Sequence, residues 1–202
     1  MGRAGHAFLA IFALFFMQLF EALAARSNVT LSVIELALFG AGLGLLFLCA
    51  AARPGEGIWG RFSFAEFTAF MLAIIATSAI YRLAVTGLEL ESPSTPINHA
   101  ELAAQLFGVA IVTPLKEEVI YRQLLFRSLS LSGSGRAQLV PILGTSVLFA
   151  LSHLAYWGTA ALLHVAVIGV LLGWARARTG GIALPLMMHI AVNTHAIVIW
   201  AL

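Results

Sequence analysis

The sequence predicts an all-α protein, a polytopic transmembrane helix bundle of about seven spans, with six to eight compatible with the pattern. Of its 202 residues, 61% are hydrophobic and only 10% are charged. A soluble domain is usually about 45–50% apolar and about 25% charged. The bilayer, rather than a large core of the protein's own, therefore solvates most of the apolar side chains. The formal charge is +2, and the basic residues are spread through the loops rather than clustered in a patch. This pattern does not indicate a nucleic-acid partner.

Seven apolar runs approach the length of about 20 residues that crosses the hydrocarbon of a bilayer. They cover residues 7–25, 30–52, 64–87, 100–128, 139–157, 160–177 and 182–202. We expect a single membrane domain over residues 1–202, with three N-terminal spans in residues 1–99 and the others in residues 100–202. Pro114 is expected to divide the fourth run, because proline lacks a backbone donor and clashes with the preceding turn.

The distribution of arginine predicts how the spans are oriented. If the spans alternate regularly, the loops on one side of the membrane hold seven arginines and the loops on the other side hold only Arg26. The seven are Arg3, Arg53, Arg61, Arg127, Arg136, Arg176 and Arg178. This positive-inside bias places the N-terminus in the cytoplasm and the C-terminus outside. The N-terminal residues also resemble a secretory signal peptide, but the alternation that begins at Arg3 favours an uncleaved first span.

Two pairs of glycines have the spacing that lets transmembrane helices approach closely. Gly40 and Gly44 form one G-x-x-x-G motif, and Gly169 and Gly173 form another. We expect both pairs to mark packing contacts within the bundle rather than a dimer interface.

Charged residues are concentrated in the stretch from Thr113 to Arg127, inside an otherwise apolar chain. Lys116, Glu117, Glu118 and Arg122 fall within seven residues. Carboxylates at membrane depth are unfavourable by several kcal/mol each on an order-of-magnitude view, so they indicate buried pairing or chemistry. Glu118 and Arg122 are four residues apart and are expected to pair on one helix face. Glu117 should face elsewhere and be free for proton transfer.

Three further polar side chains are predicted to lie near the depth of Glu117. His153 is in the fifth run, and His189 and Asn193 are four residues apart in the seventh. A glutamate and a histidine at one depth can hold and deprotonate a water molecule. A second histidine and an amide can donate to an oxygen on which charge develops. This set suits hydrolysis of an acyl bond without a covalent nucleophile, and no serine lies in a G-x-S-x-G motif.

A metal-dependent site is the competing interpretation. Glu117, His153 and His189 could supply three ligands to Zn²⁺, with water as the fourth. The sequence has no H-E-x-x-H motif. We favour a site without a cofactor.

The charged stretch and the later motifs resemble the CAAX-protease and bacteriocin-processing (Abi) family of intramembrane endopeptidases. The shared motifs occur in the family's order over about residues 100–200. They are E-E-x-x-x-R at Glu117, Glu118 and Arg122, F-x-x-x-H at Phe149 and His153, and H-x-x-x-N at His189 and Asn193.

The resemblance implies an intramembrane protease whose catalytic core lies in residues 100–202. By motif match, Glu117 would activate water with His153, and His189 and Asn193 would bind the oxyanion. Glu118 and Arg122 would support the site. The partners would be the lipid bilayer and a membrane-tethered protein or peptide, cut near a CAAX-type tail, sorting tail or leader. A compact bacterial member in the inner membrane is expected.

Two other functions are compatible with the same residues. A non-enzymatic immunity or scaffold protein of the same family would use the bundle for binding alone. A proton or ion carrier would use the glutamates and histidines as a relay. The sequence assigns neither substrate-binding residues nor an oligomeric state.

Overall fold

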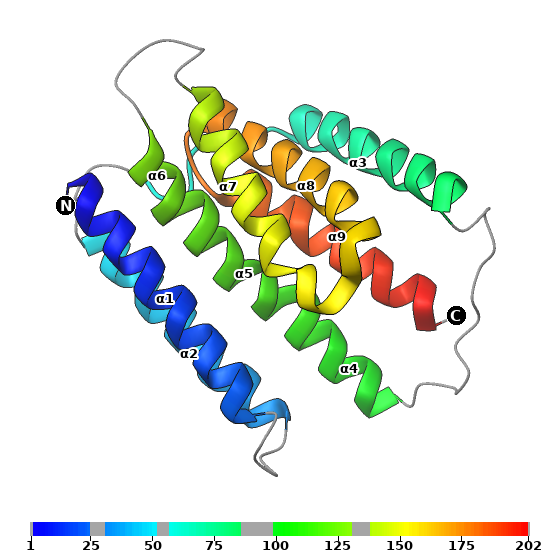
Figure 1. Cartoon of the computed structure of the whole chain (residues 1–202), viewed down its shortest axis with the longest axis horizontal. Helices are drawn as coiled ribbons and strands as arrows, with labels where there is room; N and C mark the ends of the chain where they lie inside the picture. Colours follow the sequence, from blue (N-terminus) through cyan, green and yellow to red (C-terminus); the bar gives the residue numbers. More distant parts are fainter. Residues whose placement is uncertain (1, 25–30, 52–56, 86–98, 131–137, 202) are drawn as a thin grey trace.

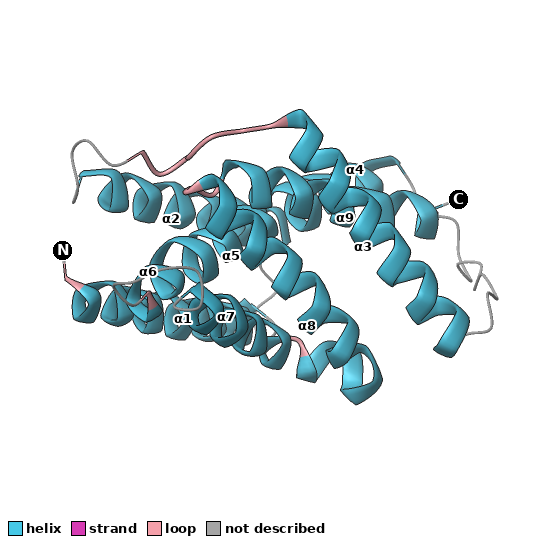
Figure 2. Cartoon of the chain, turned by 90° about the horizontal axis from the view of Figure 1, so that it is seen from above, coloured by secondary structure: helices cyan, strands magenta, loops and turns pink. Residues whose placement is uncertain are grey.

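A computed structural model describes residues 2–24, 31–51, 57–85, 99–130 and 138–201. The regular structure within these ranges is entirely helical, so the predicted all-α class is confirmed (Figure 2).

A long helical run lies at the centre of the fold. It comprises α4 (His99–Phe107), η1 (Gly108–Val112), α5 (Thr113–Glu117), η2 (Glu118–Leu125) and α6 (Phe126–Leu129). On one side of it are α1 (Arg3–Ala24) and α2 (Leu31–Ala51). On the other side are α7 (Leu139–Ser152), α8 (Leu154–Thr179) and α9 (Ala183–Ala201), with α3 (Phe64–Val85) packed outside against α8 and α9 (Figure 1).

The long run is not divided at Pro114, contrary to the sequence prediction. Val112 before the proline and Glu117 and Glu118 after it all keep right-handed helical dihedral angles. The turn directly before the proline, η1, is π-helical, and the Thr113 N–H bonds to the Gly108 carbonyl. Because these bonds already reach five residues back, the four-residue spacing that proline disrupts is absent there.

The fifth and sixth apolar runs separate at His153, not between residues 157 and 160 as the sequence predicted. The His153 Nδ1 lies 2.8 Å from the Phe149 carbonyl, which a continuing α-helix would bond to the His153 N–H. That N–H bonds instead to the Ala150 carbonyl at 3.0 Å. The imidazole thus ends α7, and α8 begins at the next residue.

Only one of the two glycine pairs marks a close helix contact. A Cβ placed at Gly169 would lie 3.1 Å from the Ser146 Cα, and one placed at Gly173 would lie 3.4 Å from the Ile142 Cα. These contacts join α8 to α7, as predicted. A Cβ at Gly40 or Gly44 would meet nothing within 4 Å in the described structure, so the prediction is wrong for α2.

The segment before α3 is bonded to the turn between α8 and α9. The N–H groups of Arg61, Ile182 and Ala183 donate to the Thr179, Ile58 and Trp59 carbonyls at 2.9–3.0 Å. Gly60 has a φ of +67°, and a Cβ there would collide with the Gly181 backbone. Arg61 and Arg178 both meet Glu66, at 3.4 and 3.0 Å. Two arginines that the charge pattern assigned to one side of the membrane therefore lie together.

Two helices in the described ranges are long and apolar enough to cross a bilayer: α3, and residues Ala161–Thr179 of α8. Shorter apolar helical segments occur at Arg3–Phe16, Ala37–Leu46, Leu139–Ser152 and Ala183–Val198. The arrangement of about seven spans stays a prediction.

Replacing Gly169 with leucine should destabilise the bundle by about 1–3 kcal/mol, because the added side chain overpacks the α7–α8 contact. Thermal unfolding of the detergent-solubilised protein measures this as a lower Tm. Gly40→Leu is the matched control, since its side chain enters open space. Equal unfolding temperatures for the two variants would contradict the close packing at Gly169.

Candidate active site

The two adjacent glutamates lie at the junction of α5 and η2 and are both buried. Glu117 is the last residue of α5 and is 6% exposed, and Glu118 is the first residue of η2 and is fully buried. All eight residues of η2 are buried. Single π-helical turns are frequent at functional sites, because they rotate side chains out of the α-helical register.

His189, on α9, contacts both glutamates. Its Nδ1 lies 2.9 Å from the Glu118 Oε1, and its Nε2 lies 3.6 Å from the Glu117 Oε2. The prediction that Glu117 faces away from the surroundings of Glu118 is therefore wrong, because both carboxylates contact the same imidazole. The two nitrogens lie on opposite edges of the imidazole, so one ring can reach carboxylates on consecutive residues.

The expected ion pair between Glu118 and Arg122 is present and fully buried. The Arg122 Nη1 lies 3.3 Å from the Glu118 Oε1. The Nη2 donates to the Gly169 carbonyl on α8 at 3.2 Å. The guanidinium also lies 4.6 Å from the centre of the Phe149 ring on α7. This one side chain therefore connects the long run to two neighbouring helices.

Phe149 is the apolar centre of the site. Its ring contacts both imidazoles, at centroid distances of 5.7 Å to His189 and 4.7 Å to His153. The Tyr121 ring packs against it edge-on at 5.3 Å. Phe149 thus holds the two predicted catalytic histidines around a common ring.

His153 does not touch Glu117 directly. Its polar contacts within the described chain are the Phe149 carbonyl at 2.8 Å and the Ser152 hydroxyl at 3.3 Å, both from Nδ1. A carbonyl only accepts, so the bond to Phe149 assigns the proton of a neutral ring to Nδ1 and leaves Nε2 as the acceptor. The half-buried imidazole thus has a basic nitrogen directed away from its own helix.

Asn193 lies one turn beyond His189, and its amide Nδ2 donates to the Val109 carbonyl of η1 at 2.8 Å. Since His189 meets Glu118 and Asn193 meets the earlier Val109, α9 runs antiparallel to the long run. Asn193 is therefore an interhelical contact in this structure. Its second amide N–H can donate to another group.

Several buried polar atoms of the cluster have no hydrogen-bond partner among the described residues. They are Glu117 Oε2, Glu118 Oε2, and Arg122 Nε and Nη1. An unsatisfied buried polar atom typically costs about 1–3 kcal/mol. The cluster can therefore accept a polar partner such as water or a substrate group.

Zinc has no assembled ligand set in the described parts of the chain, where no group of three or more His, Cys, Asp or Glu side chains could hold a metal ion. In particular, Glu117, His153 and His189 are not gathered at one point. Metal-independent chemistry stays a prediction.

Sequence reasoning misassigned Arg176, which it placed in a loop. Arg176 is 6% exposed, and its Nε donates to the Arg122 carbonyl at 2.9 Å. Its guanidinium lies 5.4 Å from the centre of the Phe126 ring. Nothing in the sequence distinguishes it from the exposed Arg178, because only the fold turns it towards η2.

Arg122→Met should destabilise the protein by about 3–5 kcal/mol, because it leaves the Glu118 carboxylate buried without its counter-charge. Thermal unfolding and the folded fraction on size exclusion measure the loss. The double variant Glu118→Gln/Arg122→Met should recover part of it, since no charge is then stranded. A single variant as stable as the double variant would contradict the proposed pairing energy.

Comparison with known proteins covers the part of the chain that holds this site. Residues 99–195, just under half of the chain, match a family model described as Rce1-like, type II CAAX prenyl endopeptidase Rce1-like. An uncharacterized 24.3 kDa protein of Escherichia coli is 30% identical over 92 residues, which is 44% of this chain and 41% of that relative. No solved structure matches the chain. The resemblance carried by the three motifs is thereby confirmed, because the matched residues 99–195 contain all three of them.

Proposed function

We propose that this protein is an intramembrane endopeptidase that uses Glu117 to activate water and hydrolyses a peptide bond near the C-terminus of a membrane-associated protein. The observation that carries the proposal is the Glu117 carboxylate. It is buried, its Oε2 has no hydrogen-bond partner among the described residues, and this atom lies 3.6 Å from the His189 Nε2. The family match supports the endopeptidase class.

The charges of the cluster give the two glutamates different roles. Arg122 balances Glu118, which in turn holds the Nδ1–H of His189. The His189 Nε2 faces Glu117 at 3.6 Å. Glu118 is thereby committed to positioning the imidazole, while Glu117 is left to accept a proton.

The reaction then proceeds by general base catalysis. Glu117 takes a proton from water, and the water oxygen attacks the carbonyl carbon of the scissile bond. As Glu117 becomes neutral, negative charge appears on the carbonyl oxygen, to which the His189 side chain can donate a hydrogen bond. The carbonyl re-forms, the C–N bond breaks, and the proton held by Glu117 passes to the leaving amine.

In this mechanism His153 orients the attacking water and Asn193 donates to the oxyanion. The bond from Nδ1 to the Phe149 carbonyl leaves the His153 Nε2 as an acceptor that can orient the attacking water. Asn193 can direct its second N–H to the oxyanion while the first stays on Val109.

The outer surface of the bundle supports the proposed substrate class. Apolar side chains cover the outside of α1 and α3, including Phe8, Phe15 and Ile80, each more than 60% exposed. Such surfaces suit lipid contact, and a membrane-tethered tail is the substrate that such a bundle can reach. We further propose about seven spans, with the N-terminus in the cytoplasm of a bacterium and the C-terminus outside.

Glu117→Gln should reduce cleavage of a prenylated CAAX peptide by about 10²–10⁴-fold, because the amide cannot accept the proton of water. The reconstituted full chain and a fluorogenic peptide give the rate. Glu66→Gln is the matched control, since Glu66 lies in an exposed ion-pair cluster away from His189. A Glu117→Gln protein that cleaves at the normal rate, or that retains a biological effect without cleavage, would instead support a binding role.

Chelation should leave the cleavage rate unchanged, because the proposed base is a carboxylate and needs no metal-bound water. The rate is measured before and after treatment with 1,10-phenanthroline and dialysis. Loss of activity that zinc restores would replace this mechanism with the metal-dependent one.

A further inference from the structure

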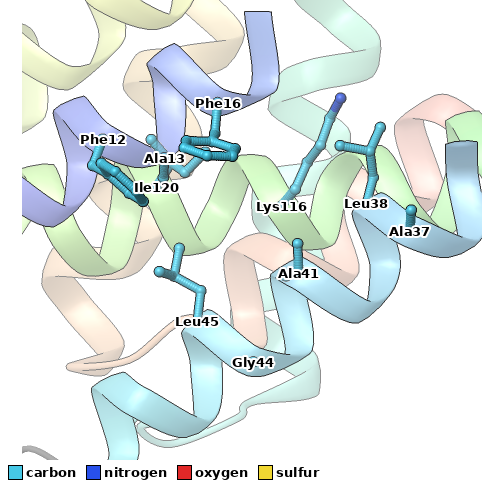
Figure 3. Close-up of a pocket in the computed structure, with 11 residues that line it drawn as sticks. Phe12, Ala13, Phe16, Ala37, Leu38, Ala41, Gly44, Leu45, Lys116 and Ile120 are labelled. Carbon is cyan, nitrogen blue, oxygen red and sulfur yellow. The ribbon is translucent and has the colours of Figure 1, made fainter. Parts of the chain in front are cut away.

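A cavity of about 320 Å³ lies between α1, α2 and the long run. This volume is at the lower end of the range of small-molecule sites, about 300–1,000 Å³. Figure 3 shows it bounded by Phe12 and Phe16 of α1, by α2 around Gly44 and Leu45, and by the long run at Ile120.

The lining of this cavity is apolar except at one end. Among the described residues, phenylalanine, leucine, isoleucine, alanine and glycine form nearly all of its wall, and Lys116 contributes the one charged side chain. In Figure 3 the Lys116 side chain extends beside Leu38 at that end. No atom lies within 4 Å of a Cβ placed at Gly44, so α2 leaves the space open at this wall.

The cavity and the carboxylate cluster lie on opposite sides of the same helix. Lys116 and Ile120 face α1 and α2, whereas the neighbouring Glu117 and Glu118 meet His189 on α9. Figure 1 shows α1–α2 and α9 on different sides of the long run. An occupant of the cavity would therefore not be the bond that is cut.

We propose that this cavity binds a fatty acid, with its hydrocarbon chain between α1 and α2 and its carboxylate on Lys116. Burying an alkyl chain against this lining is favourable by about 0.8 kcal/mol per methylene. A lysine among apolar side chains at membrane depth favours an anion. Its ammonium has three donors, so a carboxylate can join the contacts that Lys116 already makes.

The position of Lys116 along the helix favours a fatty acid over a phospholipid. Lys116 lies in the middle of the long run, far from both ends of the helix, whereas a phospholipid head group stays at the membrane surface. A carboxylic acid can enter the apolar interior in its neutral form, because the neutral form has little desolvation cost compared with the ion. It can then ionise beside the ammonium.

Photolabelling of the full chain in detergent tests the proposal. The probe is hexadecanoic acid that carries a mid-chain diazirine, and hexadecanol with the same label is its uncharged counterpart. The acid should label residues of the cavity such as Phe12 and Leu45, and unlabelled hexadecanoic acid should compete. Lys116→Gln should lower labelling by the acid about tenfold, as expected for the loss of one charge-assisted hydrogen bond, and leave labelling by the alcohol unchanged.

A second variant fills the cavity. Gly44→Phe should abolish labelling by both probes, whereas Gly40→Phe, on the same helix but outside the lining, should not. Each variant is first checked for an unchanged Tm, and Lys116→Gln alone decides the test if Gly44→Phe does not fold. The proposal is overturned if acid and alcohol label equally, if adducts lie outside the cavity, or if only a prenylated peptide competes.

Discussion

The buried ion pair between Glu118 and Arg122 is the constraint on which the rest of the site depends. Both side chains are fully buried, and the pair lies at 3.3 Å. The cost of removing charges from water is offset as their remaining donors and acceptors find partners. Arg122 contacts the Gly169 carbonyl of α8 and the Phe149 face of α7, and Glu118 contacts the imidazole on α9. The pair in this way links three helices to the long run.

The same pair gives two chemically identical residues different surroundings. Glu118 forms an ion pair with Arg122 and accepts a hydrogen bond from His189, so its charge is balanced on two sides. Among the described residues, Glu117 has only the more distant contact of 3.6 Å to the other nitrogen of the ring. A buried carboxylate with few hydrogen bonds can exchange a proton with water. A carboxylate held by an ion pair and a hydrogen bond must lose those contacts to do so. Adjacent glutamates thus differ because their neighbours differ.

The long run has chemically different surroundings on its two sides. Towards α7, α8 and α9 it presents the polar cluster, and towards α1 and α2 it presents an apolar cavity with a lysine at one end. The π-helical turns of η1 and η2 lie next to both.

Much of this arrangement could be inferred from the sequence, because it depends on local spacing. The all-α class follows from composition, and the Glu118–Arg122 pair follows from the four-residue helical repeat. The three motifs indicated the family resemblance and the polar residues now found on α5, η2 and α9 and at the junction of α7 with α8. Each of these features belongs to one helix or to the chain as a whole.

Contacts between helices were decided only by the tertiary structure. The spacing of residues did not indicate that His189 meets both glutamates, that Asn193 is held by Val109, or that Arg176 is buried. It also did not show that the helix continues through Pro114 or that α7 ends at His153. Nor did it show that, among the described residues, Gly40 and Gly44 lack a close neighbour. The physical reason is that periodicity determines which side chains share a face of one helix. The rotation of each helix and its shift along a neighbour are set by packing and hydrogen bonds across the whole bundle.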